Sequence, residues 1–267
     1  MLVLSTLALA IAAPVPLDHS HAQAELGVFT TDGDSAFVTT LSGRVAATRL
    51  LAFELDIPFV ATTGSPGNTV FGNVGFRALA RTRIAKSTVF EGGLGVAAGT
   101  AEADDFGEIG TYSVATAMTG YRRSREFVPG GASVYLPVRF ESAFRFGLFI
   151  RNQAAFDVIF PTDSDRGDPL IQLTWEGGPG YRSGIFEAHL AVGVAGLFPT
   201  GSGSSDGQVT LIPRVRVYSS SKPLKTGAFY GQAAFNLNLD EPFGFSFDEG
   251  RVWGLFFAAG YTFPKLF

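Results

Sequence analysis

Hydrophobic positions alternate with polar or small ones along most of this chain. In LLAFELDIPFV, residues 50–60, Leu51, Phe53 and Leu55 fall on one face, and Glu54 and Asp56 fall on the other. Carboxylates inside an apolar stripe of period two indicate a β-strand, because a helix repeats its apolar positions every three to four residues. The alternation recurs up to the end of the chain, so the sequence predicts an all-β protein.

Turn-forming clusters separate the alternating segments. Glycine allows positive φ and proline removes a ladder donor, so such clusters are expected to end strands. They are GSPGN at 64–68, TDSDRGDP at 162–169, GGPG at 177–180, PTGSGSSDG at 199–207 and SSSKP at 219–223. About twelve strands are predicted, near residues 36–46, 50–60, 70–82, 87–98, 110–122, 132–141, 144–160, 170–176, 185–197, 209–218, 226–239 and 251–263. The segment 144–160 fits either one long strand or two.

Composition narrows the classes of function. The chain has 267 residues, a formal net charge of −4 and no cysteine, so it forms no disulfide and uses no thiolate chemistry. No cluster of Lys and Arg is present to neutralise phosphates, so nucleic-acid binding is not expected. Mean hydropathy is +0.23, yet no uncharged run after residue 25 approaches the about 18–20 apolar residues of a transmembrane helix. The apolar surface is instead distributed over many short segments.

The N-terminal stretch MLVLSTLALAIAAPVPLDHSHAQAE has the layout of a secretory signal peptide. Ala22, Gln23 and Ala24 form an A-x-A cleavage pattern before Glu25, which predicts a signal peptide over 1–24 and a single domain over 25–267. No Lys or Arg precedes the apolar core, so a start further upstream stays open. A retained anchor helix is the other alternative, although Pro14 and Pro16 interrupt the apolar run.

Both a soluble β-sandwich and a transmembrane β-barrel show this alternation. The polar face here is poor in Lys and carries Arg, Glu and Asn among small residues such as Gly93 and Gly95, which suits a barrel interior better than a solvent-exposed face. Aromatic residues lie near strand ends, as in the girdles of membrane barrels; they are Phe160, Phe198, Tyr218, Trp253 and Tyr261. We therefore expect a single antiparallel up-and-down transmembrane β-barrel of about 12 strands, an even number.

Charged side chains opposite the apolar stripes are the candidate functional residues of the lumen. They either close the interior as a salt-bridge network or line a narrow pathway and set its selectivity. The candidates are Glu54, Asp56, Arg77, Arg81, Glu91, Arg139, Glu141, Arg145, Glu187, His189, Arg214 and Arg216.

Enzymatic chemistry has one weaker candidate. His189 is the single histidine after residue 24 and shares a strand face with Glu187, so a His–carboxylate pair with a serine from a neighbouring strand is conceivable. The alternative is a polar lumen residue in a hydrogen-bond network, and no catalytic residue is assigned. The acidic segments DDFGE at 104–108 and TDSDRGD at 162–168 lack EF-hand spacing and are interpreted as solvated loops, so neither a metal nor a cofactor is expected.

The AQA site, the alternation over nearly the whole chain and the ending GLFFAAGYTFPKLF together resemble bacterial outer-membrane β-barrels. The resemblance implies export through the periplasm, residence as a monomer in Gram-negative outer-membrane lipid, and an assembly signal at Tyr261, Phe263 and Phe267 that the barrel-assembly machinery reads. Pro264 cannot donate to a ladder, so the last strand is expected to end at Phe263.

Within that class, residues 53–81 and VAGLFPTGSG at 194–203 are similar to the barrels grouped with phenol meta-pathway proteins. This resemblance implies a porin-like passive channel or uptake route for small, often apolar molecules. The alternatives are a structural or surface-recognition barrel with its lumen plugged by side chains, and a lipid-modifying barrel enzyme that uses His189.

Overall fold

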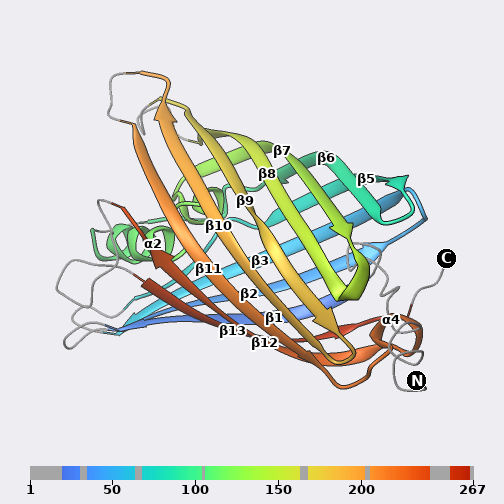
Figure 1. Ribbon diagram of the computed structural model, residues 1–267. Helices are drawn as coiled ribbons and strands as arrows, with labels where there is room; N and C mark the ends of the chain where they lie inside the picture. The colour runs from blue at the N-terminus through green and yellow to red at the C-terminus, as the bar shows by residue number, and fades with distance from the viewer. Residues whose placement is uncertain are drawn as a thin grey trace, which may run out of the picture.

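Antiparallel strands close into a β-barrel in the computed structural model, which describes residues 20–30, 35–63, 68–103, 106–162, 168–201, 205–240 and 253–264 (Figure 1). The strands are β1 His21–Thr30, β2 Ser35–Ala46, β3 Leu51–Thr63, β4 Thr69–Phe71, β5 Gly75–Ala85, β6 Thr88–Ala97, β7 Gly131–Ala143, β8 Leu148–Pro161, β9 Leu170–Ser183, β10 Phe186–Pro199, β11 Asp206–Tyr218, β12 Ala228–Asn238 and β13 Trp253–Thr262. Consecutive strands pair, except that β5 pairs with β3 and not with β4; β1 also pairs with β13, with Ala24 opposite Ala259. That last pairing leaves no free sheet edge.

The ring contains twelve strands among the described residues, because β4 and β5 occupy one position beside β3. The residues between them, 72–74, leave the ladder. The Asn73 side chain donates to the backbone oxygens of Arg125, at 3.0 Å, and Val128, at 2.9 Å, in the segment that enters the barrel. This interruption of the wall therefore lies where that segment is attached. The prediction of an antiparallel barrel of about twelve strands is confirmed.

Two of the predicted strand positions differ from the structure. Residues 110–122 do not form a strand, because α2 spans Phe106–Met118 and is followed by the short helix α3, Ser124–Phe127. Tyr112, Ala115 and Met118 are buried at a spacing of three, which is a helical period. The count of twelve still holds because β1, His21–Thr30, supplies a strand that was not predicted; its first four residues fall in the predicted signal peptide.

Cleavage after Ala24 would remove the first four residues of β1, His21–Ala24, which pair with both β2 and β13. The Ser20 backbone oxygen also accepts a hydrogen bond from the Phe263 N–H at 2.9 Å. The cleavage site stays a prediction. Cleavage after Ala24 would remove these backbone hydrogen bonds from the barrel.

Three other boundaries follow from local packing. The segment 144–160 forms one strand, β8, preceded by a 3₁₀ turn, η2, Arg145–Gly147. β9 runs through GGPG instead of ending before it, because Gly180 leaves space for the Phe149 ring; a Cβ at Gly180 would lie 2.2 Å from that ring. β13 ends at Thr262, one residue before the predicted end.

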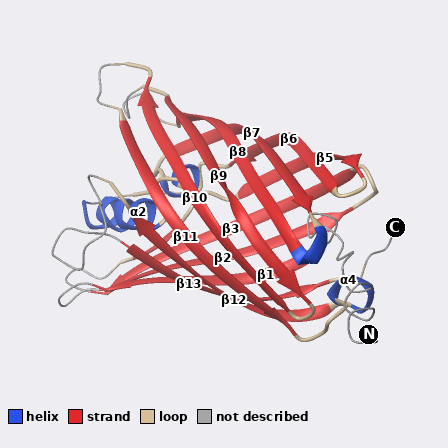
Figure 2. Cartoon of the chain, viewed as in Figure 1, coloured by secondary structure: helices blue, strands red, loops and turns tan. Residues whose placement is uncertain are grey.

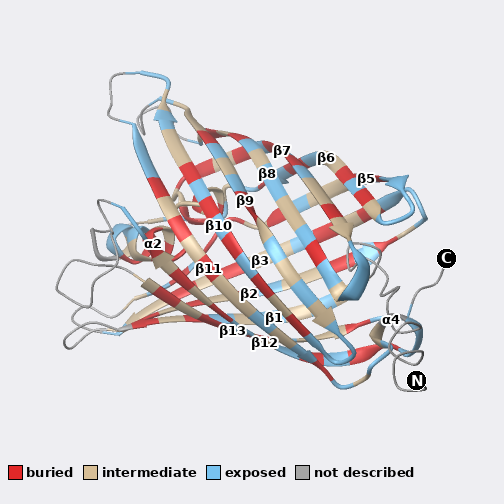
Figure 3. Ribbon diagram, viewed as in Figure 1, coloured by how far each residue is buried: buried red, intermediate tan, exposed pale blue. Residues whose placement is uncertain are grey.

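Burial is the reverse of that in a soluble protein (Figure 3). Glu91, Glu141 and Asp157 are 0% exposed, whereas Leu94 is 52% exposed and Leu136 is 51% exposed. The alternation therefore places most of the charged side chains of the strands inside and most of their large aliphatic and aromatic side chains outside, as the sequence pattern predicted. A soluble sandwich would bury the apolar stripe.

The two ends of the barrel differ (Figure 2). At one end lie the start of β1, the end of β13, the short connections at 86–87 and 184–185, and α4, Pro223–Thr226. At the other end lie the longer connections, including the 33-residue segment 98–130 that carries α2 and α3. We call these the short-turn end and the long-loop end. Among the described residues, no helix has the length and apolar character needed to cross a bilayer.

Candidate functional site: the barrel lumen

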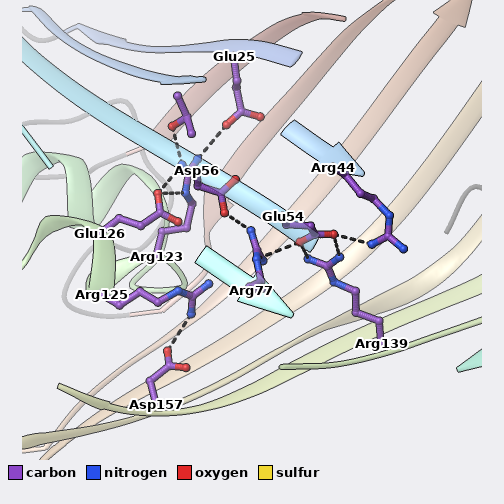
Figure 4. A network of polar contacts seen from close by, with 11 residues as sticks. Glu25, Arg44, Glu54, Asp56, Arg77, Arg123, Arg125, Glu126, Arg139 and Asp157 are labelled. Carbon is purple, nitrogen blue, oxygen red and sulfur yellow. Dashed lines mark hydrogen bonds and ion pairs between the residues drawn. The ribbon is translucent and has the colours of Figure 1, made fainter. Parts of the chain in front are cut away.

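Glu54 is the centre of the most connected ion-pair network in the lumen (Figure 4). The Arg44 Nη1 donates to it at 2.6 Å, the Arg139 Nη2 donates at 3.0 Å, and the Arg77 Nε lies 2.9 Å from its Oε2. Arg44 also pairs with Glu91, and Arg77 also pairs with Asp56. These residues come from β2, β3, β5, β6 and β7, so the network joins five strands through their inward positions. We call it the Glu54 network.

A second network joins the adjacent part of the wall, β7 to β10. Arg151 donates to Glu141 at 2.8 Å and to Glu187 at 3.2 Å, and Arg182 donates to Glu187 at 2.7 Å and to Glu141 at 3.2 Å. The Phe149 ring lies against both guanidiniums, with centroid distances of 5.0 and 4.6 Å. Buried ion pairs satisfied on both sides lock side-chain positions rather than leave charge free.

The segment 106–127, which we call the plug segment, enters the barrel from the long-loop end and is attached to the wall on several sides. Arg123 bonds Glu25 on β1 at 2.8 Å and Thr40 on β2 at 2.5 Å. Arg122 bonds Glu176 on β9 at 2.5 Å, and Arg125 bonds Asp157 on β8 at 2.8 Å. On β12, Asn236 and Asn238 donate to the backbone oxygens of Met118, at 3.2 Å, and Ala117, at 3.1 Å.

The plug segment also has an apolar contact with the wall. Tyr112, Ala115, Met118 and Phe127 pack against inward side chains of β1 to β4, β12 and β13. Burial, together with the charge of Glu108, raises the pKa of Tyr112 to about 12, so its hydroxyl stays protonated. It donates to the Phe71 backbone oxygen at 2.7 Å. Gly120 lies two residues beyond the end of α2 and has φ +58°; a Cβ there would lie 2.2 Å from Thr210 Oγ1.

Two cavities in the lumen are lined by described residues. One, of about 310 Å³, lies against the plug segment and is lined by residues that include Asp56, Arg77, Arg122, Arg123 and Arg125. The other, of about 180 Å³, is lined by residues that include His21, Arg44, Glu54, Arg216 and Tyr218. We call them the plug cavity and the Arg216 cavity.

Four residues border both cavities, which places the two spaces next to each other along the lumen: Arg139, Gln153, Glu176 and Arg214.

Eleven of the twelve lumen candidates named from the sequence lie on inward strand positions. Arg145 is the exception, and its assignment to the lumen was wrong. Phe146 and Gly147 have positive φ values of 63° and 81°, so they form a turn, and Arg145 is exposed there instead of lying in β8.

Six further arginines that shape the lumen were not among the candidates named from the sequence: Arg44, Arg122, Arg123, Arg125, Arg151 and Arg182. Strand parity identifies Arg44, which alternates with Leu41, Gly43 and Val45 on β2. Strand parity does not identify the three arginines of the plug segment, because Arg122 and Arg123 follow α2 and Arg125 lies in α3.

His189 and Glu187 face the same side of β10 but are not joined by a hydrogen bond. The His189 Nε2 lies 3.2 Å from the Gly178 backbone oxygen, and its ring stacks on Phe149 with a centroid distance of 5.6 Å. Both carboxylate oxygens of Glu187 are bonded to arginines. In the described part of the chain His189 has no serine partner either, so a nucleophile–base–acid arrangement is not assembled.

The two acidic segments lie partly outside the described residues, which exclude 104–105 and 163–167. Within the described ranges, no group of three metal-ligating side chains comes together. Of the C-terminal aromatic residues, Phe263 is 43% exposed and Tyr261 stacks edge-on against it at 5.1 Å. Phe267 is outside the described residues.

Similarity to solved structures is extensive in shape and low in sequence. An outer-membrane channel from Pseudomonas putida F1 aligns with a TM-score of 0.59 at 10% identity, over 94% of this chain and 97% of that chain. The fold is that of outer-membrane β-barrels. The NanC porin aligns with a TM-score of 0.54 at 9% identity over 91% of this chain and 98% of that one.

The β domain of the Bordetella autotransporter BrkA aligns with this barrel with a TM-score of 0.50 at 13% identity, over 92% of this chain and 97% of that domain. No protein-family model matches the sequence, and no curated protein sequence matches it. The similarity therefore extends to the barrel fold and not to any binding residue.

Proposed function

We propose that this protein is an outer-membrane channel through which small molecules cross passively. The observation that carries the proposal is the pair of adjacent cavities, of about 310 and 180 Å³, inside a closed barrel. An eight-stranded barrel is just filled by its own side chains, and a barrel of twelve strands is wider. The remaining space, lined by charged side chains, is a suitable route for small solutes.

The orientation follows from the two ends of the barrel. Outer-membrane barrels have short turns on the periplasmic side and longer loops outside. We therefore place the short-turn end, with the start of β1, the end of β13 and α4, in the periplasm, and the plug segment near the outer surface.

The resemblance to phenol meta-pathway barrels leads us to propose small, often apolar cargo. The charged lining adds a requirement: a molecule that passes the lumen presents a polar or charged group to the arginines. The ion-pair networks then act as the structural part of the lumen, and Arg214 and Arg216 act as the part that sets selectivity.

Single-channel recording in planar bilayers tests this function. The wild-type protein is expected to give discrete conductance steps, and the double variant Arg214→Gln/Arg216→Gln is expected to lose anion preference. Arg145→Gln, an exposed arginine on η2, is the matched control. Unchanged conductance and ion preference in the double variant would remove Arg214 and Arg216 from the pathway.

A wild-type barrel that gives no conductance steps would favour the second candidate function, a barrel plugged by its own side chains that acts through its loops. The observation that favours this candidate is the attachment of the plug segment to β1, β2, β8, β9 and β12. Removal of the plug segment, discussed below, separates the two candidates.

We also propose that the chain is exported through the periplasm, assembles as a monomer, and presents Tyr261, Phe263 and Phe267 to the barrel-assembly machinery. The exposed Phe263 side chain at the short-turn end supports this proposal. Deletion of Phe267 is expected to lower the fraction of heat-modifiable protein in the outer membrane without changing its synthesis.

A further inference from the structure

Arg216 has an environment unlike that of the other lumen arginines. Its Nε and Nη2 donate to the Gln232 Oε1 at 3.0 and 2.6 Å, and its Nη1 donates to the Tyr218 hydroxyl at 3.3 Å. Its guanidinium lies over the Tyr230 ring, 4.6 Å from the centroid. All of these partners are neutral, and among the described residues no carboxylate forms an ion pair with Arg216.

The guanidinium of Arg216 also retains hydrogen-bonding capacity. An arginine has five N–H donors, and the three contacts above use three of them. One N–H on each terminal nitrogen therefore has no acceptor among the described residues. Two terminal N–H groups side by side are the arrangement that binds a carboxylate through both of its oxygens.

The carboxylates near Arg216 are already occupied. Glu187 lies opposite Arg216 in the β10–β11 register, but its two oxygens bond Arg151 and Arg182. Glu176, which lines the same cavity, bonds Arg122 and Arg214. This wall of the lumen therefore carries more positive than negative charge, and a bound anion would balance it.

The Arg216 cavity has an aromatic wall beside this charge. The Tyr218 and Tyr230 rings are 5.8 Å apart and line the cavity together with Arg214 and Arg216. A cavity of about 150 Å³ is known to be large enough for benzene, and this one measures about 180 Å³. The space fits a molecule with a single ring and a short polar group.

We propose that the Arg216 cavity binds a small carboxylate that carries one ring. The carboxylate accepts the remaining N–H groups of Arg216 and is held near the neighbouring charge of Arg214. The ring lies against Tyr218 and Tyr230. This inference rests on the proposed channel function in one respect: the ligand reaches the cavity through the lumen.

Calorimetric titration of the folded, detergent-purified barrel with benzoate tests the site without requiring conductance. Benzoate is expected to bind at least tenfold more tightly than benzyl alcohol, because only the carboxylate forms charge-assisted hydrogen bonds with both remaining N–H groups of Arg216. Benzoate is also expected to bind at least tenfold more tightly than acetate, which lacks the ring.

Arg216→Gln is expected to weaken benzoate binding about tenfold or more, whereas Arg145→Gln, the exposed control, leaves it unchanged. Heat-modifiable gel mobility establishes that each variant is folded. If Arg216→Gln does not fold, the comparison of benzoate, benzyl alcohol and acetate on the wild-type barrel still decides the question.

Three results would overturn the proposal: no binding of benzoate to the wild-type barrel, equal affinity for benzoate and benzyl alcohol, or equal affinity for benzoate and acetate. Single-channel recording separates this failure from failure of the channel function. A barrel that conducts but does not bind benzoate refutes the site alone. A barrel that binds benzoate but never conducts refutes the channel and leaves the site.

Discussion

Glu54 is the residue whose replacement tests most directly how the lumen is held together. Its side chain is 7% exposed and contacts Arg44, Arg77 and Arg139. Replacement by Gln removes the charge and keeps the shape. Arg44 then still pairs with Glu91, and Arg77 still pairs with Asp56. Arg139 has no second carboxylate among the described residues. The loss of stability in Glu54→Gln therefore comes mainly from leaving the Arg139 charge unpaired.

The magnitude follows from the surroundings of Arg139. Breaking a buried ion pair by removing one partner costs about 3–5 kcal/mol. The Arg139 side chain is 16% exposed and borders both cavities, so water reaches it and the cost lies at the lower end. We expect Glu54→Gln to lower the free energy of unfolding by about 3 kcal/mol. Asp56→Asn, on the same strand face, leaves Arg77 with Glu54 and is expected to cost about 1 kcal/mol.

Urea unfolding of the barrel in lipid vesicles, followed by heat-modifiable mobility, measures both variants. With a slope of about 1–3 kcal/mol per molar urea, Glu54→Gln is expected to lower the midpoint by about 1 M or more. In the double variant Glu54→Gln/Arg139→Gln the unpaired charge is absent, so the loss is expected to be smaller than the sum of the single losses. Equal midpoints for Glu54→Gln and Asp56→Asn, or additive losses in the double variant, would refute the reasoning.

Three further predictions address the outer face, the plug segment and the N-terminus. Leu55 is 42% exposed at the middle of the apolar stripe of β3. Leu55→Arg is expected to lower the free energy of unfolding by about 2–4 kcal/mol in the same assay. A loss no greater than that of Asp56→Asn would count against the lipid-facing assignment of Leu55. The residues that flank segment 102–129 are close together, because the Gly130 N–H donates to the Ala101 backbone oxygen at 2.7 Å. Replacing 102–129 by two glycines is therefore expected to leave a folded barrel with a higher single-channel conductance. An unchanged conductance would show that the plug segment does not obstruct the route. N-terminal sequencing of protein from outer membranes is expected to find Glu25 first if Ala22–Ala24 is the cleavage site, whereas a start at or before Ser20 would retain all of β1 and His21.

The alternation of β3 determined, without any tertiary information, that Leu55 faces outward and that Glu54 and Asp56 face inward. This inference succeeds because successive side chains of a strand point to opposite faces of the sheet. In a wall that separates lipid from lumen, an odd or even position along the strand therefore decides which side a residue faces. The strand count and the apolar outer band follow from the same local rule. The twelve strands predicted are not the same set as the twelve observed, since β1 takes the place of the expected strand at 110–122.

Only the tertiary structure decided which charges meet and what occupies the lumen. The partners Arg44 and Glu91 are 47 residues apart, and Arg123 and Glu25 are 98 apart, so their pairing depends on barrel closure and on the path of the plug segment. Parity fails at Arg145 because two consecutive positive φ values replace the strand by a turn. It also cannot describe α2, where burial follows a helical period set by contact with the inner wall. Local periodicity therefore determined the wall of this protein, and long-range packing determined its interior.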